Sequence, residues 1–183
     1  MAEYGVGGLT ISEMARRMGV RPPSLYKYFP SLHAVYDSLY AKGVAGNALA
    51  VEAAIGSIPA GRKRIRAGVR ATVRWCIENP PLAQLLYWRP VPGFEPSAEA
   101  FAASVEGMEG ARAELTAAVR RGELHESADS DDALRLLTML MSGCISQQMA
   151  NQPGVDYDHG LFSRLTDEAV DMFFAHYDPN RRT

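Results

Sequence analysis

One short segment near the N-terminus gathers side chains that donate hydrogen bonds to anionic groups. Its cations and hydroxyl groups lie within eight positions of one another: Arg21, Ser24, Tyr26, Lys27 and Tyr28. Such groups can contact the phosphate oxygens and base edges of nucleic acid. A helix through this segment would turn the apolar Leu25 and Phe29, four residues apart, to one face and leave the polar groups on the other.

The residues before this segment predict a first short helix. Thr10 and Glu13 have the spacing of a capping box, in which the hydroxyl and the carboxylate each satisfy a backbone N–H group at the helix start. An apolar stripe at positions i, i+3, i+4 and i+7 follows, formed by Ile11, Met14, Ala15 and Met18.

A tight turn and a second helix come next. Gly19 suits the left-handed residue that ends a helix, and Val20 can pack back between the two helices. Pro22 and Pro23 fit the first turn of a helix, where their missing N–H groups are not needed. Because Pro30 ends the second helix, the pattern predicts a helix-turn-helix.

Two short helices with a glycine between them also occur in α-helical proteins that never contact DNA. This segment, however, resembles the helix-turn-helix of the TetR family of bacterial transcriptional repressors. The matching residues are Leu9-Thr10-Ile11, Met14-Ala15, Gly19-Val20 and Ser24-Leu25-Tyr26-Lys27-Tyr28-Phe29-Pro30-Ser31. The resemblance covers about the first 45 residues and implies an all-α fold, with a helix-turn-helix head on a larger helical domain for ligand binding and dimerisation.

The resemblance also implies which side chains contact DNA. It places phosphate contacts at Thr10, Ser24, Tyr26 and Tyr28, and it places Arg21 and Lys27 near the groove. The complete predicted DNA-binding set is Thr10, Arg21, Pro22, Ser24, Tyr26, Lys27, Tyr28 and His33.

Two departures from the family pattern are visible. The family usually has a lysine soon after the recognition helix, and here Ser31 is followed by Leu32 and His33. Family members also begin with a further helix. We expect Met1–Gly5 to correspond only to its last turn, so that the first helix is missing or truncated.

Composition and charge support a division into a small head and a larger body. The chain has 183 residues, of which 47% are hydrophobic, and a net charge of −2. Residues 1–45 contain five Lys and Arg against three Asp and Glu, whereas the remainder contains fourteen against eighteen. We therefore predict a DNA-binding domain over 1–45 and an effector-binding and dimerisation domain over 46–183.

Beyond the head, proline and glycine divide a pattern without strand alternation. The pattern predicts helices over 32–55, 60–79, 97–121, 131–148 and 160–177, with a short helix after Pro80-Pro81 and a stiff connection over 89–96. The last two helices are apolar on several sides, which fits the four-helix homodimer interface implied by the resemblance. Two core helices of a monomer are the alternative interpretation.

Aromatic, methionine and cysteine side chains of the body are candidates to line an apolar ligand cavity. They are Trp75, Tyr87, Trp88, Phe94, Phe101, Met108, Met139 and Cys144. Gln147, Gln148 or Arg112 could supply a polar contact. Ordinary core packing, or a surface position for the polar residues, is the alternative interpretation.

Arginines recur every four residues along one predicted helix, at Arg62, Arg66, Arg70 and Arg74. We interpret them as a solvated helix face. The alternative is contact with DNA or with an acidic effector.

Catalytic and metal-binding patterns are weak in this chain, and we expect no catalytic residue, metal or cofactor. His125, Glu126 and Asp129 lie in a short acidic connection without a second histidine at metal-binding spacing. Cys76 and Cys144 lie in apolar helical runs and are interpreted as reduced thiols, which favours a cytoplasmic location. The strongest apolar run, 133–145, is too short to span a bilayer.

These patterns predict a ligand-responsive, dimeric DNA-binding transcriptional regulator. We expect a repressor that binds a near-palindromic double-stranded operator and leaves it when a small apolar or aromatic effector binds. The alternative is a dimeric all-α small-molecule binding protein that no longer binds DNA.

Overall fold

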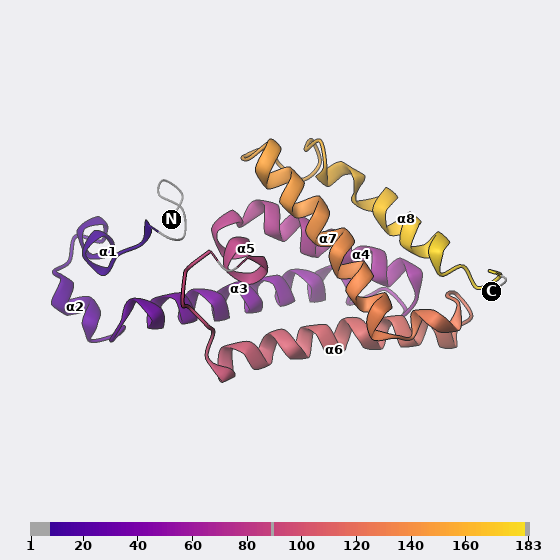
Figure 1. Ribbon diagram of the computed structural model, residues 1–183, viewed down its shortest axis with the longest axis horizontal. Helices are drawn as coiled ribbons and strands as arrows, with labels where there is room; N and C mark the ends of the chain where they lie inside the picture. Colours follow the sequence, from indigo (N-terminus) through magenta and orange to yellow (C-terminus); the bar gives the residue numbers. More distant parts are fainter. Residues whose placement is uncertain (1–7, 89, 182–183) are drawn as a thin grey trace. The chain divides into compact units, whose positions relative to one another are not determined.

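The computed structural model describes residues 8–88 and 90–181, and every regular element within these ranges is a helix (Figure 1). The α-helices are α1 Ile11–Arg17, α2 Pro22–Tyr26, α3 Leu32–Ile55, α4 Arg62–Glu78, α5 Pro80–Tyr87, α6 Ala98–Arg120, α7 Asp131–Asn151 and α8 Thr166–His176. Short 3-10 helices cover Glu126–Ala128 and Ser163–Leu165. The predicted all-α fold is confirmed. The expectation for Met1–Gly5 falls outside the described residues.

The chain forms two compact units. The first comprises residues up to Ala45 together with Asn79–Ser104, and the second comprises Gly46–Glu78 together with the chain from Val105 onward. The chain passes from the first unit to the second after residue 45, and the functional domains over 1–45 and 46–183 stay a prediction. Residues 79–104, which the sequence analysis assigned to the body, group with the head.

The helix-turn-helix has a small apolar core of its own. Ile11, Ala15 and Leu25 are buried, and Met14 and Leu32 pack against them. Met18, predicted to continue the stripe, is 66% exposed instead, because α1 ends at Arg17 and leaves this side chain beyond the packed turns. Val20 is also exposed, so it does not anchor the two helices.

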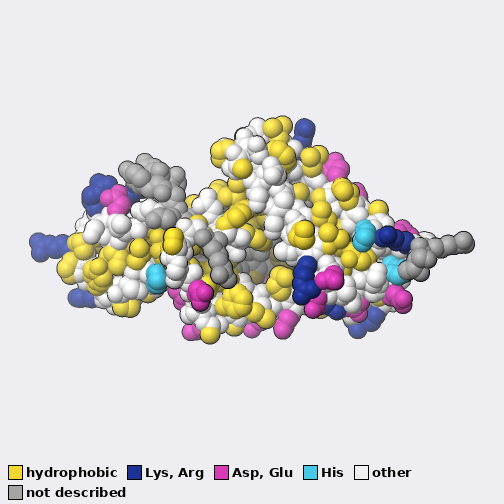
Figure 2. Space-filling view, viewed as in Figure 1, with side chains coloured by type: hydrophobic (Ala, Val, Ile, Leu, Met, Phe, Trp, Pro, Cys, Tyr) yellow, Lys and Arg dark blue, Asp and Glu magenta, His cyan; other side chains and the backbone are white. Residues whose placement is uncertain are grey.

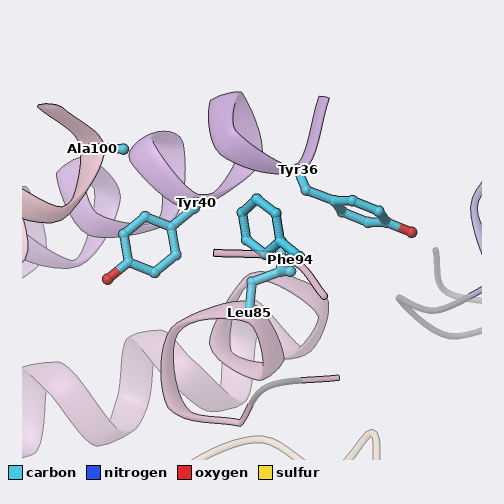
Figure 3. Packing of buried hydrophobic residues seen from close by; sticks show 5 residues of the cluster. All are labelled: Tyr36, Tyr40, Leu85, Phe94 and Ala100. Carbon is cyan, nitrogen blue, oxygen red and sulfur yellow. The ribbon is translucent and has the colours of Figure 1, made fainter. Parts of the chain in front are cut away.

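A second core in the first unit is built around two tyrosines of α3. Tyr36 and Tyr40 are buried with Leu85 of α5, with Phe94 from the 88–97 connection and with Ala100 of α6. Figure 3 shows the Phe94 ring between the two tyrosine rings. The ring centroids of Tyr36 and Phe94 lie 5.6 Å apart, a separation typical of favourable aromatic pairs.

Hydrogen bonds also tie the start of α6 to α3. The Ser97 N–H and hydroxyl donate to the two carboxylate oxygens of Asp37 at 2.6 and 2.8 Å. Ser97 Oγ in turn accepts the Ala100 N–H at 3.2 Å and caps α6. The Tyr40 hydroxyl lies 2.9 Å from the Ser104 hydroxyl.

The second unit is organised around the packing of α4, α7 and α8 on one another. Its buried side chains include Val73, Cys76, Leu115, Ile145, Val170 and Phe173. Arg64 of α4 ties α6 into this unit through an Nε hydrogen bond of 2.8 Å to Glu114.

The arginines of the α4 series stay partly exposed to solvent, but each of them has a partner. Arg66 and Arg70 pair with Asp167, and Arg66 also pairs with Asp171. Arg74 binds Asp158 with two hydrogen bonds of 2.9 and 2.8 Å. At the other end, Arg62 donates to the Phe174 carbonyl at 3.2 Å and lies 3.9 Å from Asp178. We call these pairs the arginine ladder. The ladder holds α8 and the preceding connection against α4.

A buried glutamine shapes the connection between α7 and α8. Gln148 is buried, and its Oε1 accepts the N–H groups of Phe162 and Ser163 at 3.0 and 3.3 Å, while its Nε2 donates to the Gln152 carbonyl at 2.9 Å. A Cβ atom at Gly160 would lie 2.4 Å from Gln148 Oε1. Residues 160–162 are therefore held in a turn, which explains why α8 begins at Thr166 and not at Gly160 as predicted.

The ladder predicts a pH-dependent contribution to stability. Arg70 first, and then Arg66, hold the pKa of Asp167 below its ordinary value of 3.8. A lowered pKa stabilises the folded chain above the unfolded pKa, and this contribution is lost as the pH falls through the native pKa. We expect Asp167→Asn to lower the free energy of unfolding by about 0.5 to 1 kcal/mol at pH 7 and by less below pH 4.

The measurement is urea unfolding from pH 7 to pH 3, with Glu168→Gln as the matched control. Glu168 lies in the same first turn of α8 and is exposed, and it makes no ion pair with the residues that the structure describes. Both variants remove one negative charge near a helix N-terminus. Equal losses in the two variants at every pH would contradict a specific role for the Asp167 pairs.

Candidate nucleic-acid interface

The start of α1 presents a hydroxyl group that keeps its hydrogen free. Thr10 is the N-cap of α1, and its Oγ1 accepts the Glu13 N–H at 3.2 Å. The hydroxyl hydrogen remains able to donate to a phosphate oxygen. Only this half of the predicted capping box forms, because the Glu13 carboxylate accepts hydrogen bonds from Arg16 and Arg17 instead.

The turn between the helices has the predicted geometry. Gly19 has a φ of +68°, the left-handed conformation that glycine adopts without a steric penalty. Pro22 and Pro23 occupy the first two positions of α2, with Arg21 as the N-cap. The helix then ends at Tyr26, so that α2 is shorter than predicted. Lys27 and Tyr28 lie in the turn that follows, where the N–H groups of Tyr28 and Phe29 both bond to the Leu25 carbonyl.

The structure brings the predicted donors together on the solvent side of this short helix. Arg21, Pro22, Ser24, Tyr26, Lys27 and Tyr28 are all exposed, whereas Leu25 is buried. Tyr28 is 78% exposed, a high value for a large aromatic side chain. Figure 2 shows dark-blue cationic side chains projecting from the part of the surface formed by α1 and α2. An exposed row of donors is the arrangement needed to contact an extended anionic backbone.

The cations of the head differ in how they are neutralised. Arg16 Nη2 and Arg17 Nε both lie 2.7 Å from Glu13 Oε1, and these two arginines lower the pKa of Glu13 to about 2. Arg21 and Lys27 make no ion pair with any residue that the structure describes. Their charge is therefore available to a phosphate without first breaking an internal pair.

His33 lies in a different environment from the other predicted residues. It is exposed in the first turn of α3, and its ring packs edge-on against Phe94 with centroids 6.0 Å apart. The neighbouring Ser31 is a candidate that the sequence analysis missed. Its Oγ accepts the Ala34 N–H at 3.1 Å, leaving a free hydroxyl hydrogen at the start of α3. The serine directly after Pro30 is the signal that could have identified this cap.

The eight predicted ligand-binding residues do not share one environment. Trp75 borders a surface cleft of the second unit, and Phe94 belongs to the tyrosine cluster of the first. Tyr87 and Trp88 are half-buried and face one another with ring centroids 6.0 Å apart. Cys144 is half-buried, and burial raises the pKa of its thiol. Phe101, Met108 and Met139 are exposed.

The residues considered as polar contacts to a ligand do not share one site. Gln148 is a buried residue of α7 that binds the connection to α8, and Gln147 is exposed. Arg112 pairs with Asp131 at 2.6 Å and with Asp129 at 3.2 Å. Among the described residues, no group of three or more His, Cys, Asp and Glu side chains could hold a metal ion. No helix in the described ranges is long and apolar enough to cross a membrane.

The two regions of the chain match two family profiles. Residues 1–38 match the profile described as "Bacterial regulatory proteins, tetR family", and residues 65–173 match "Tetracyclin repressor-like, C-terminal domain". The second match alone spans more than half of the chain. The chain has no significantly similar relative among curated proteins.

Solved structures of similar fold span almost the whole chain. One is the TetR family transcriptional regulator PfmR from Thermus thermophilus, with a TM-score of 0.74, 18% identity, and coverage of 95% of this chain and 92% of that one. Another is a protein of unknown function from Rhodococcus sp. RHA1, with a TM-score of 0.75, 22% identity, and coverage of 97% and 89%. A third is the putative regulatory protein SCO4313, with a TM-score of 0.68, 19% identity, and coverage of 95% and 89%. At these identities the likeness establishes the fold.

The unpaired charge of Lys27 leads to a prediction for DNA binding. We expect Lys27→Ala to weaken binding to all DNA sequences and to reduce the slope of log K against log salt by about one unit, because one phosphate contact is lost. The measurement is fluorescence anisotropy over a salt series. Lys63→Ala is the matched control, since Lys63 is an exposed lysine of α4 outside the head. A slope that does not change in Lys27→Ala would exclude this phosphate contact.

Proposed function

Because the chain belongs to the TetR family of bacterial regulatory proteins, we propose that this DNA-binding transcriptional regulator is a dimeric repressor released from its operator by a small-molecule effector. The observation that carries the proposal is the head, where exposed hydroxyl groups and two unpaired cations lie on a helix-turn-helix. In the proposed complex, Thr10, Ser24, Tyr26 and Tyr28 contact phosphates, and Arg21 and Lys27 lie near the groove.

An exposed apolar surface on α7, α8 and the connection between them supports the dimer. Met139, Leu161, Leu165 and Met172 are all exposed, at 68, 50, 43 and 67% respectively. In Figure 2 the surface over the C-terminal part of α7 is mostly yellow and white, with few charged groups. Gly143 lies one turn after Met139, and a Cβ added there would meet nothing within 4 Å. Apolar and small side chains allow two copies of a helix pair to pack closely.

A two-fold dimer suits this head. Two recognition helices separated by about one turn of DNA read a near-palindromic sequence in adjacent major grooves. The affinity of each head is modest because the head carries few unpaired cations, so the joined pair gains from the high effective concentration of the second head.

The proposed mechanism of release is a change in the separation of the two heads. An effector that fits one arrangement of the helical body better than another shifts the population toward that arrangement. The helix α3 is 24 residues long; it begins at Leu32, directly after the helix-turn-helix, and its part from Gly46 onward belongs to the second unit. A coupling of about 1 to 3 kcal/mol between effector and operator would change occupancy about 5- to 150-fold.

The test of function is binding to the DNA that flanks the chain's own gene. We expect selective binding in the presence of excess random DNA, with an affinity that falls as salt rises. The 183-residue chain is measured beside a version extended through any in-frame upstream codons. Binding by neither version would favour the alternative, a dimeric small-molecule binding protein that does not bind DNA.

The proposed interface gives a second prediction. Met139→Glu places a buried carboxylate in each half of the dimer contact, and we expect it to weaken dimerisation by roughly 2 to 4 kcal/mol. Sedimentation equilibrium measures the change. Leu49→Glu is the matched control, because Leu49 of α3 is equally exposed, at 66%, and lies outside the proposed interface. A stable dimer in Met139→Glu would exclude Met139 from the contact.

A further inference from the structure

The second unit contains an open cleft of about 730 Å³. Its lining comes from the C-terminal half of α3, one face of α4, the connection that precedes α8 and the first turn of α8. The lining residues on which the argument depends are Ala53, Ala71, Trp75, Tyr157 and Arg164. We call it the α4 cleft. A volume of this size accommodates a small organic ligand.

Part of the wall formed by α3 and α4 is apolar. Five alanines line the cleft, three from α3 and two from α4, together with the Trp75 indole. A Cβ atom at Gly46 would lie 3.1 Å from the Trp75 ring, so that Trp75 lies close against the backbone of α3. Small side chains beside a fixed indole form a surface that suits a flat ring system.

The charged groups of the cleft are balanced internally, with one exception. Arg74 is held by Asp158 and lies over the Tyr157 ring, with its guanidinium carbon 4.4 Å from the ring centroid. Arg70 is held by Asp167. Arg164 is exposed and makes no ion pair with any residue that the structure describes. The cleft therefore offers one free guanidinium beside an apolar wall.

We propose that the α4 cleft binds a small aromatic monocarboxylic acid, with its ring against Trp75 and the alanine wall and its carboxylate paired with Arg164. A guanidinium matches a carboxylate through two parallel hydrogen bonds. A polyanion would meet Glu78, Asp158 and Asp167 with no further free cation among the described lining residues to balance it, so the cleft favours a single negative charge. The inference rests on the proposed function and names the class of its effector.

The position of the cleft connects it with α3. Ala50, Ala53 and Ala54 lie in the last two turns of this helix, so an acid bound in the cleft contacts the same helix that begins next to the helix-turn-helix. The arginines Arg70 and Arg74 of the wall also belong to the arginine ladder. A ligand bound in the cleft therefore contacts α3, α4 and the start of α8.

The test uses the full chain and two probes of similar shape, one with a carboxylate and one with a neutral carboxamide. Isothermal titration calorimetry measures binding of 1-naphthoate and of its neutral analogue 1-naphthamide. We expect the chain to bind one naphthoate per protomer and to bind naphthamide more weakly. Arg164→Gln is expected to weaken naphthoate binding about fivefold or more and to leave naphthamide binding unchanged.

Two further variants locate the site. Arg120→Gln is the matched control, because Arg120 is an exposed arginine of the same unit outside the cleft, and we expect it to bind naphthoate as the unmodified chain does. Ala53→Phe places a ring in the cleft from an exposed position and is expected to weaken both probes. Equal affinity for naphthoate in Arg164→Gln and Arg120→Gln would overturn the proposal, as would unweakened binding in Ala53→Phe.

Operator binding, measured on the same samples, separates this inference from the proposed function. Selective operator binding without naphthoate binding overturns the cleft assignment and leaves the repressor proposal in place. Naphthoate binding that depends on Arg164, without operator binding by any form of the chain, supports the cleft and overturns the repressor.

Discussion

The ion pairs between α4 and the C-terminal part of the chain fix where α8 and the connection before it lie on α4. Arg66 and Arg70 fix Asp167 in the first turn of α8, and Arg74 fixes Asp158 in the connection before it. With α8 held against α4 by these charges, Met172 of α8 and Leu165 directly before it remain exposed. The same pairs neutralise the α4 arginines. Among the described lining residues of the α4 cleft, Arg164 is therefore the cation without an ion pair.

In the head, too, an acidic residue neutralises nearby arginines. Glu13 forms ion pairs with Arg16 and Arg17, because the spacing of i, i+3 and i+4 brings the three side chains together on one side of the helix. The segment from Arg21 to Tyr28 contains no acidic residue. Arg21 and Lys27 therefore remain unpaired where the hydroxyl groups gather. The modest net charge of the chain conceals this local excess.

Local signals in the sequence predicted most of the helices and the turn of the head, because Gly19, Pro22 and Pro23 act through their own backbone geometry. The helix Leu32–Ile55 also has the predicted bounds. Contacts between distant residues were not predictable. Asp158 and Asp167 lie more than 80 residues from their arginines, and Gln148 reaches a turn fourteen residues away. The candidate cavity residues do not share one site, because the apolar character of a residue does not tell which part of the fold its side chain faces.

The two glycines in the middle of α3 give this helix an uneven stiffness. A Cβ atom at Gly43 would make an ordinary contact with Leu86 at 3.4 Å, whereas one at Gly46 would lie only 3.1 Å from the Trp75 ring, so the absence of a side chain matters at Gly46. Each glycine also costs roughly 0.5 to 1 kcal/mol of helix stability relative to alanine. A helix of 24 residues is about 36 Å long, and both glycines lie near its middle, next to residue 45, where the chain passes from the first unit to the second. The close contact between α3 and the Trp75 indole is thus obtained at the expense of the intrinsic stability of α3.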